Sequence, residues 1–241
     1  MDLSKLWEDE HFVFWENFEE KFREPIEESH QKFDAADGID EARAWLIEND
    51  IDAEKLPFAC KLVGVDSSWD YDLPEIEHPV CRIVYQFKNV GARDCLVFPI
   101  SENGEIVDYG ILHTPDFTFA TVRQKAIWLG GDNITGDEVR LHSSVERWLS
   151  AGATGCVYID QQRRTPMKRL QAVTKIFCDD VELALEAWDW GFGADDAALD
   201  RFEIDDTPEN IESYFKAMAE RRAISQALNS KHPGRFNLVA A

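Results

Sequence analysis

The dipeptide Asn103-Gly104 is the feature that most restricts how this chain can fold. It separates two apolar runs, residues 95–100 and residues 105–110. Because Asn-Gly readily takes the positive φ angles of a two-residue turn, the pattern predicts a tight β-hairpin. Other short runs rich in Val, Ile, Phe and Tyr precede it and are bounded by Asp, Gly, Asn and Pro, at residues 58–65 and 80–87. We therefore expect several short strands in the centre of the chain.

The pattern changes after the hairpin to strand, helix and strand. Residues 138–142 predict a strand, Ser144 can cap a helix that ends at Ala151, and residues 155–160 predict another strand. This order within about 22 residues makes a βαβ unit, whose two strands are parallel and joined by a right-handed crossover. A buried strand over residues 173–178 follows. We expect an α+β fold with an α/β-like core and a mixed sheet.

Amphipathic helices are predicted on both sides of this core. Residues 3–33 place apolar side chains at three- and four-residue spacings, and Pro25 should kink or end that helix. Residues 41–49 predict a second helix with Asp40 as its cap. Thr207 and Pro208 begin a carboxy-terminal helix. These patterns divide the chain into three predicted regions: an acidic helical region, a mixed α/β core, and an acidic loop with a helix, at residues 1–55, 56–190 and 191–241.

Acidic residues are concentrated in two blocks of the chain. The 241 residues carry a formal charge of −22. Residues 1–55 hold 18 acidic and 6 basic residues, and residues 179–212 hold 13 acidic residues and a single basic one, Arg201. This balance argues against direct binding of nucleic acid or anionic lipid. It favours a protein partner, such as a basic or nucleic-acid-binding protein, although acidity can also serve only to keep a protein soluble.

Apolar runs and cysteine spacing bear on the cellular location. No apolar run reaches the roughly 18 residues that a membrane span needs, and the amino terminus lacks the layout of a signal peptide. The five cysteines form no C-x-x-C pair, which favours reduced core residues over disulfides or a zinc site. We expect a cytoplasmic protein without a membrane-spanning segment.

Carboxylates at the predicted carboxyl edge of the parallel strands are the candidate metal ligands. The common nucleotide-binding, zinc-protease and hydrolase motifs are absent from the sequence. Asp160 ends one predicted strand, and Asp179 and Asp180 follow another. Carboxylates at one sheet edge can share a hard cation such as magnesium, but acids at a helix start also complement the helix dipole.

Two groups of residues are candidates for binding an anion. His142, Ser143 and Ser144 lie where a parallel strand meets a helix, a place where backbone amides can bind anions. A helix cap at Ser144 explains the same pattern. The second group is a basic patch on and before a short helix predicted over residues 166–172, formed by Arg163, Arg164, Lys168 and Arg169. Pairing with the acidic blocks within the molecule is an equal explanation for this patch.

Several segments, in order, resemble proteins of the Toprim/primase family. Residues 41–51 resemble the short helix and turn that precede the catalytic core of primase-type proteins. Residues 95–110 are similar to the strand-turn-strand before their Toprim domain, and residues 125–130 to the linker that follows. Residues 139–160 have the length and rhythm of the first Toprim βαβ unit. The resemblance covers residues 40–160.

The chain departs from the Toprim pattern at the family's catalytic positions. Toprim domains carry a glutamate followed by glycine at the end of the first strand, where this chain has residues 140–143 without that pair. They also carry an Asp-x-Asp that holds magnesium, where this chain has adjacent Asp179 and Asp180. The resemblance therefore implies a degenerate copy that has lost its chemistry and needs no cofactor. We expect a non-catalytic accessory or regulatory protein of DNA replication or mobile-element biology.

Two other functions remain open from the sequence. One is a magnesium-dependent phosphoryl-transfer enzyme of nuclease or primase type that uses Asp160, Asp179 and Asp180. The other is an acidic mimic of nucleic acid, in which both acidic blocks form one face that occupies a DNA-binding protein. Convergence of the three aspartates favours the enzyme, whereas one continuous acidic face favours the mimic.

Overall fold

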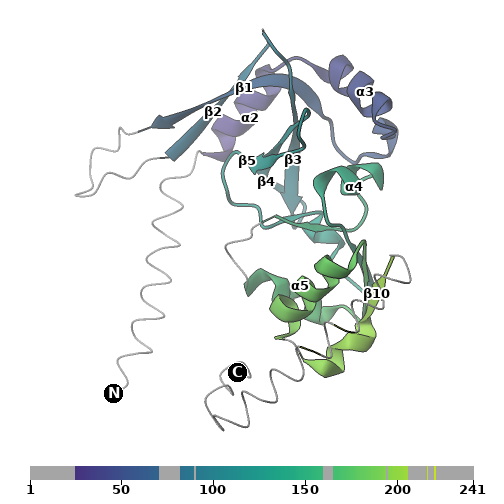
Figure 1. Ribbon diagram of the computed structural model, residues 1–241. Helices are drawn as coiled ribbons and strands as arrows, with labels where there is room; N and C mark the ends of the chain where they lie inside the picture. Colours follow the sequence, from purple (N-terminus) through teal and green to yellow (C-terminus); the bar gives the residue numbers. More distant parts are fainter. Residues whose placement is uncertain are drawn as a thin grey trace, which may run out of the picture. The chain divides into compact units, whose positions relative to one another are not determined.

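The chain folds into two compact units in a computed structural model (Figure 1). The structure describes residues 25–70, 82–89, 91–159, 165–193 and 195–205, with Lys216 and Glu220. Unit 1 comprises Met1–Ala53, Pro57–Ile100 and Glu105–Ala126, and unit 2 comprises Glu54–Leu56, Ser101–Gly104 and Ile127–Ala241. This division differs from the three regions expected from the sequence, because strand pairing assigns parts of the central region to both units.

Unit 1 is built on a five-stranded sheet in the order β2-β1-β3-β4-β5, whose described pairings are antiparallel. The strands are β1 (Lys61–Asp70), β2 (Arg82–Lys88), β3 (Cys95–Glu102), β4 (Glu105–His113) and β5 (Phe119–Thr121). The predicted hairpin is confirmed, since β3 and β4 are joined at Asn103 and Gly104, which have φ angles of 55° and 78°. Positive φ at both positions is the signature of a type I′ turn. Short strand β5 was not predicted.

Two helices pack on the sheet of unit 1. Helix α2 (Ile26–Ala35) contributes Phe33 to a core with Val63, Val97 and Tyr109. Helix α3 (Ile39–Glu48) packs on β1 and buries Ala42 and Leu46, and the short helix η1 (Ala53–Lys55) follows. Alternating residues of the central strands face opposite sides, so that Phe98 stacks instead on Phe58 and Phe119.

Two predictions about these helices need correction or lie partly outside the described residues. Helix α2 begins directly after Pro25, which is tolerated at a helix start because its missing amide has no partner there; residues 1–24 of the predicted first helix lie outside the described chain. The cap predicted for α3 at Asp40 is wrong. Gly38 occupies that position with a φ of 106°, and a Cβ on it would lie 2.2 Å from the Leu62 carbonyl oxygen. Only glycine fits this close approach.

Unit 2 contains a sheet of three parallel strands. Strand β9 (Lys175–Cys178) lies in the middle and pairs with β10 (Phe202–Ile204) on one side and with β7 (Glu138–Leu141) on the other. In the described chain, the predicted pair of parallel strands over residues 138–142 and 155–160 is reduced to one isolated bridge, since β7 pairs with β9 and residues 157–158 pair in a separate sheet. Helix α4 (Val145–Ser150) follows β7, and the chain returns so that Cys156 bridges Leu141 in parallel. Strand β8 (Val157–Tyr158) then pairs antiparallel with β6 (Trp128–Leu129). Both units together have the expected α+β class with mixed sheets.

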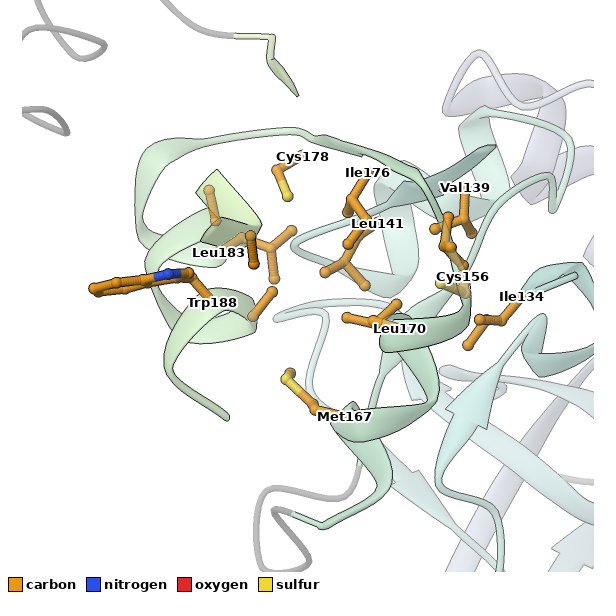
Figure 2. Packing of buried hydrophobic residues seen from close by; sticks show 14 of the residues in the cluster. Ile134, Val139, Leu141, Cys156, Met167, Leu170, Ile176, Cys178, Leu183 and Trp188 are labelled. Carbon is orange, nitrogen blue, oxygen red and sulfur yellow. The ribbon is translucent and has the colours of Figure 1, made fainter. Parts of the chain in front are cut away.

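The core of unit 2 lies between its strands and helix α5 (Val181–Phe192). Figure 2 shows Leu141 and Ile176 from adjacent strands with Leu183 and Trp188 from α5 around them. Three short 3₁₀ helices complete the described part of the unit: η2 (Gly131–Asn133), η3 (Thr165–Ala172) and η4 (Asp196–Arg201). The basic helix predicted over residues 166–172 coincides with η3.

Cysteine burial agrees with the prediction of reduced core residues for the four cysteines that the structure describes, which are free and buried: Cys60, Cys95, Cys156 and Cys178. Cys81 and most of the predicted carboxy-terminal helix lie outside the described residues. Among the helices that the structure describes, none combines the length and the hydropathy that crossing a bilayer requires.

Candidate functional site

Polar side chains gather at the carboxyl edge of strands β7 and β9 in unit 2. Because Leu141 pairs with Cys178 in parallel register, the next residues along each strand, His142 and Asp179, are brought together. His142 Nδ1 lies 3.1 Å from Asp179 Oδ2, and the two side chains are only 4% and 8% exposed. We call the group formed here the sheet-edge cluster; its members are Arg140, His142, Ser143, Arg147, Asp179 and Asp205.

The second ring nitrogen of His142 is also occupied. His142 Nε2 lies 3.0 Å from the backbone carbonyl oxygen of Thr154. The turn that presents this carbonyl packs tightly on β7, because a Cβ on Gly155 would lie 2.4 Å from the Arg140 carbonyl oxygen. Both ring nitrogens therefore face oxygen acceptors. A neutral imidazole has one N–H and satisfies one of them, whereas a protonated ring satisfies both.

Two arginines and a backbone amide add to the positive charge around Asp179. Arg140 Nη1 lies 3.5 Å from Asp179 Oδ1, Arg147 Nη1 lies 3.8 Å from Oδ2, and the Ser143 amide donates to Oδ2 at 3.3 Å. Burial by itself raises the pKa of the Asp179 carboxyl, but the hydrogen bond and charge of His142, the Ser143 amide and Arg147 outweigh it. The net pKa of Asp179 is lowered. Asp179 is thus held as an anion.

The sheet-edge cluster has the bonding of a structural pin. A general base needs a ring nitrogen that can accept a proton from a reacting group. In His142 one nitrogen faces a carboxylate and the other a backbone carbonyl, so neither is directed at an open position. The cluster ties the ends of two strands to the turn that carries Thr154. These contacts stabilise the edge of the parallel sheet.

The structure gives the predicted metal ligands separate tasks. Asp180 caps α5 by accepting from the Leu183 amide at 2.9 Å, as the helix-dipole explanation led us to expect. Asp179 faces cations, which would repel an incoming magnesium ion. Asp160 lies outside the described residues. In the described part of the chain, no three His, Cys, Asp or Glu side chains gather as a ligand set for a metal ion.

The residues of the first predicted anion site, His142, Ser143 and Ser144, lie together, and the Asp179 carboxylate lies beside them. Ser144 caps α4 by accepting from the Arg147 amide at 3.2 Å. The Ser143 amide and the His142 ring both contact Asp179 Oδ2. A free anion at this position would have to displace that carboxylate. The groups expected to bind a ligand anion are thus directed at Asp179.

The predicted basic patch is described only in part. Lys168 is exposed and Arg169 is half-buried on η3, and the buried residues of the same helix, Met167 and Leu170, belong to the core of unit 2. The Arg169 guanidinium lies beside Gly131, where an added Cβ would be 3.3 Å from its Nη1 atom. Arg163 and Arg164 lie outside the described residues. Anion binding by this patch therefore stays a prediction.

Sequence reasoning missed three side chains of the sheet-edge cluster. Arg140 stands two residues before His142 on the same strand, and the two-residue period of a strand is a signal that could have linked them. Arg147 lies one turn into α4, beyond the cap at Ser144. Asp205 follows β10, a strand that no sequence pattern indicated, and it contacts Arg140 at 3.4 Å.

Residues 25–53 of unit 1 are rich in acidic side chains, and we call this stretch the acidic helical segment. It holds nine acidic residues and two basic ones, Lys32 and Arg43. Two of the acids form ion pairs, Glu28 with Lys32 and Glu41 with Arg93. Six others are exposed and pair with no basic side chain of the described chain: Glu27, Asp34, Asp37, Asp40, Glu48 and Asp50.

Exposed apolar side chains accompany these carboxylates on α3. Ile39 is 50% exposed and Ile47 is 64% exposed. The other large exposed apolar residues of the described chain are Ile106 and Phe117, and the Phe117 ring lies beside α3, with its centroid 6.3 Å from that of Trp45. Comparisons of the chain with protein-family models, curated proteins and solved structures gave no match.

Proposed function

We propose that this chain is a non-catalytic, Toprim-like accessory or regulatory protein of DNA replication or mobile-element biology that binds a protein partner through acidic surfaces. The observation that carries the proposal is the set of six exposed carboxylates on the acidic helical segment that pair with no basic side chain of the described residues. Like charges held close together repel one another, and a basic partner relieves this repulsion. The link to replication or mobile elements is supported by the resemblance over residues 40–160.

The geometry of the sheet-edge cluster supports the non-catalytic part of the proposal. His142 and Asp179 are buried and fully engaged with each other, with Thr154 and with the arginines. Asp180 is engaged as a helix cap. Asp179 and Asp180, the two described carboxylates that a phosphoryl-transfer enzyme would use at this edge, thus already have structural partners.

A basic or nucleic-acid-binding protein is the partner that the charge favours. Complementary charges speed association and make it sensitive to salt. The two acidic blocks belong largely to different units. Each block can therefore be altered without touching the other, which allows the mimicry alternative to be tested in the same experiment.

The test compares two variants of the full chain with equal changes of net charge. The first neutralises the acidic helical segment through Glu27→Gln, Asp34→Asn, Asp37→Asn and Asp40→Asn. The matched control changes four exposed carboxylates outside both acidic blocks, through Glu105→Gln, Asp137→Asn, Glu138→Gln and Glu146→Gln. Proteins that co-purify from the native cells are then quantified by mass spectrometry at low and at high salt.

We expect a basic protein that the wild type and the control retain and that the first variant loses. High salt should also release it, because exposed charges are screened. If no protein depends on the four carboxylates, the proposed function is wrong. A third variant, Glu182→Gln with Asp200→Asn, neutralises two exposed carboxylates of the second acidic block. Loss of the same partner from this variant as well as from the first would favour the nucleic-acid mimic.

The enzyme alternative has its own test, a titration with magnesium or manganese by isothermal calorimetry. Wild type is compared with the double variant Asp179→Asn, Asp180→Asn. We expect no saturable binding that depends on these residues, since Asp179 faces cations and Asp180 caps α5. Saturable binding that the double variant loses would contradict the non-catalytic proposal and justify nucleotide and DNA assays.

A further inference from the structure

The outward side of α3 exposes two isoleucines at a regular spacing. Ile39 and Ile47 lie eight residues apart, which is about 12 Å along a helix and within about 80° around its axis. The buried residues of the helix, Ala42 and Leu46, lie within about 60° of Ile39 around this axis and at least about 100° from Ile47, so Ile47 is the isoleucine that is farther from the buried side. Exposed isoleucines on one side of a short helix are what an apolar contact with a partner requires.

The carboxyl end of α3 has negative charge without compensation. The last turn of the helix contains no basic residue. Glu48 and Asp50 are exposed there, and neither pairs with a basic side chain of the described chain. A helix dipole is itself negative at this end, so carboxylates disfavour the helix where they stand. A cation from outside would compensate the dipole and both carboxylates.

The backbone at this end already has its hydrogen bonds. The Asn49 side chain donates to the Trp45 carbonyl at 2.8 Å, the Ile51 amide donates to Leu46 at 2.8 Å, and the Asp50 amide donates to Ile47 at 3.1 Å. The helix end therefore does not need a hydrogen-bond donor to complete its backbone. What it lacks is positive charge, next to an isoleucine that is 64% exposed.

We infer that the carboxyl end of α3 is the docking point for the protein partner, and that its occupant is a cationic amphipathic segment. An apolar side chain of that segment covers Ile47, and a lysine or arginine pairs with Glu48 and Asp50. This inference rests on the proposed function and names the class of partner. Arg43 lies one helical turn from each isoleucine, and its positive charge would repel a segment that is basic on all sides. The side of the segment that faces the isoleucines should therefore be apolar.

Fluorescence anisotropy with two labelled peptides tests the docking point on the full chain. The first peptide is helical, with leucines on one side and lysines on the other. The second has the same composition, but its leucines are scattered. The test variants are Ile47→Ser and the double variant Glu48→Gln, Asp50→Asn. Their matched controls are Ile106→Ser, an isoleucine 38% exposed in the same unit, and Glu105→Gln with Asp137→Asn, two exposed carboxylates outside the acidic helical segment.

We expect Ile47→Ser and the double variant to bind the first peptide about tenfold more weakly, because each loses one part of the contact. The controls should change its affinity less than about twofold, since an exposed position outside the contact contributes little. The wild type should bind the scattered peptide more weakly than the first. Equal affinity of Ile47→Ser and Ile106→Ser for the first peptide would overturn the inference, as would equal binding of both peptides.

The co-purification experiment separates this inference from the proposed function. If Ile47→Ser and the Glu48→Gln, Asp50→Asn variant retain a partner that the Glu27, Asp34, Asp37 and Asp40 variant loses, the docking point is wrong and the proposed function stands. Loss of the partner from Ile47→Ser, with retention by Ile106→Ser, supports the docking point. Far-UV circular dichroism of each variant ensures that the fold is intact.

Discussion

His142 and Asp179 join the ends of two parallel strands through a buried contact, with His142 Nδ1 3.1 Å from Asp179 Oδ2. Asp179→Asn removes the carboxylate that faces the His142 ring and Arg147. It leaves Arg140 with Asp205 as its only carboxylate partner in the described chain. We expect the free energy of unfolding to fall by about 3 kcal/mol, as when one partner of a buried charged pair is removed. Urea denaturation measures this loss.

Asp205→Asn is the matched control for that variant. It removes the same charge from the same cluster, but the Asp205 side chain is 76% exposed. An exposed ion pair contributes little, so the change should stay below about 0.5 kcal/mol. Equal effects of the two variants would contradict the description of the sheet-edge cluster as a structural pin.

Acid should remove the stabilisation that Asp179 provides. The pKa of this carboxyl is lowered in the folded protein from an ordinary value of 3.8. The ionised form therefore stabilises the fold above the ordinary pKa, and this contribution is lost as pH falls through the folded pKa. The unfolding free energies of wild type and Asp179→Asn should differ fully at pH 7 and converge in acid. A gap that widens on acidification would contradict the sign of the shift.

Local chemistry explains which elements could be predicted from the sequence. The β3-β4 turn follows from the φ angles that Asn103 and Gly104 tolerate. The cap at Ser144 follows from a side-chain oxygen that accepts from an amide three residues later. Each of these features depends on neighbours in the sequence. A pattern read along the chain contains the necessary information.

Pairing between distant segments explains what could not be predicted. Strand β10 has only three residues and becomes a strand because it pairs with β9. The contact of His142 with Asp179 depends on β7 lying beside β9, which no local pattern specifies. The Thr154 carbonyl is a backbone group, so residue type contains no sign of its role. The sequence pattern therefore places His142 and Asp179 at the end of their strands, but it contains no sign that the two side chains contact each other.

Asp108 is a second buried carboxylate, and it accepts four backbone amides in unit 1. Its Oδ1 atom accepts from Tyr109 and Arg123 at 2.8 Å, and its Oδ2 atom accepts from Lys125 at 2.8 Å and Ala126 at 3.1 Å. Asp108→Asn replaces one acceptor by a donor that faces further donors. We expect a loss of at least about 3 kcal/mol in the free energy of unfolding.

Thermal or urea unfolding of Asp108→Asn and of Glu105→Gln on the same strand provides the comparison. Glu105 is exposed, so its neutralisation should change stability by less than about 0.5 kcal/mol. If Asp108→Asn is as stable as the control, the carboxylate does not hold the segment after β5 in place.

His113 should titrate above the ordinary range of histidine. A hydrogen bond from the ring to Asp116, with Nδ1 2.6 Å from Oδ1, raises the pKa of His113, and the nearby Asp94 adds to the effect. The folded state thus favours the protonated ring, and any such contribution disappears as pH rises through the folded pKa. An NMR titration of the ring should show a midpoint that Asp116→Asn lowers more than Asp94→Asn. Equal effects would contradict the shorter contact with Asp116.

Cys156 and Cys178 report on the opening of the parallel sheet in unit 2. Both contact the core beside Leu141, which bridges Cys156 on one side and pairs with Cys178 on the other. Burial raises the pKa of both thiols, so the reactive thiolate is scarce in the folded state. We expect iodoacetamide to label neither residue in the native protein at pH 8, and to label both in urea, as measured residue by residue by mass spectrometry. Asp179→Asn should speed labelling under native conditions, because loss of the pin lowers the free energy of local opening. Rapid labelling of the wild-type thiols would instead show that this core opens without the loss of the His142–Asp179 contact.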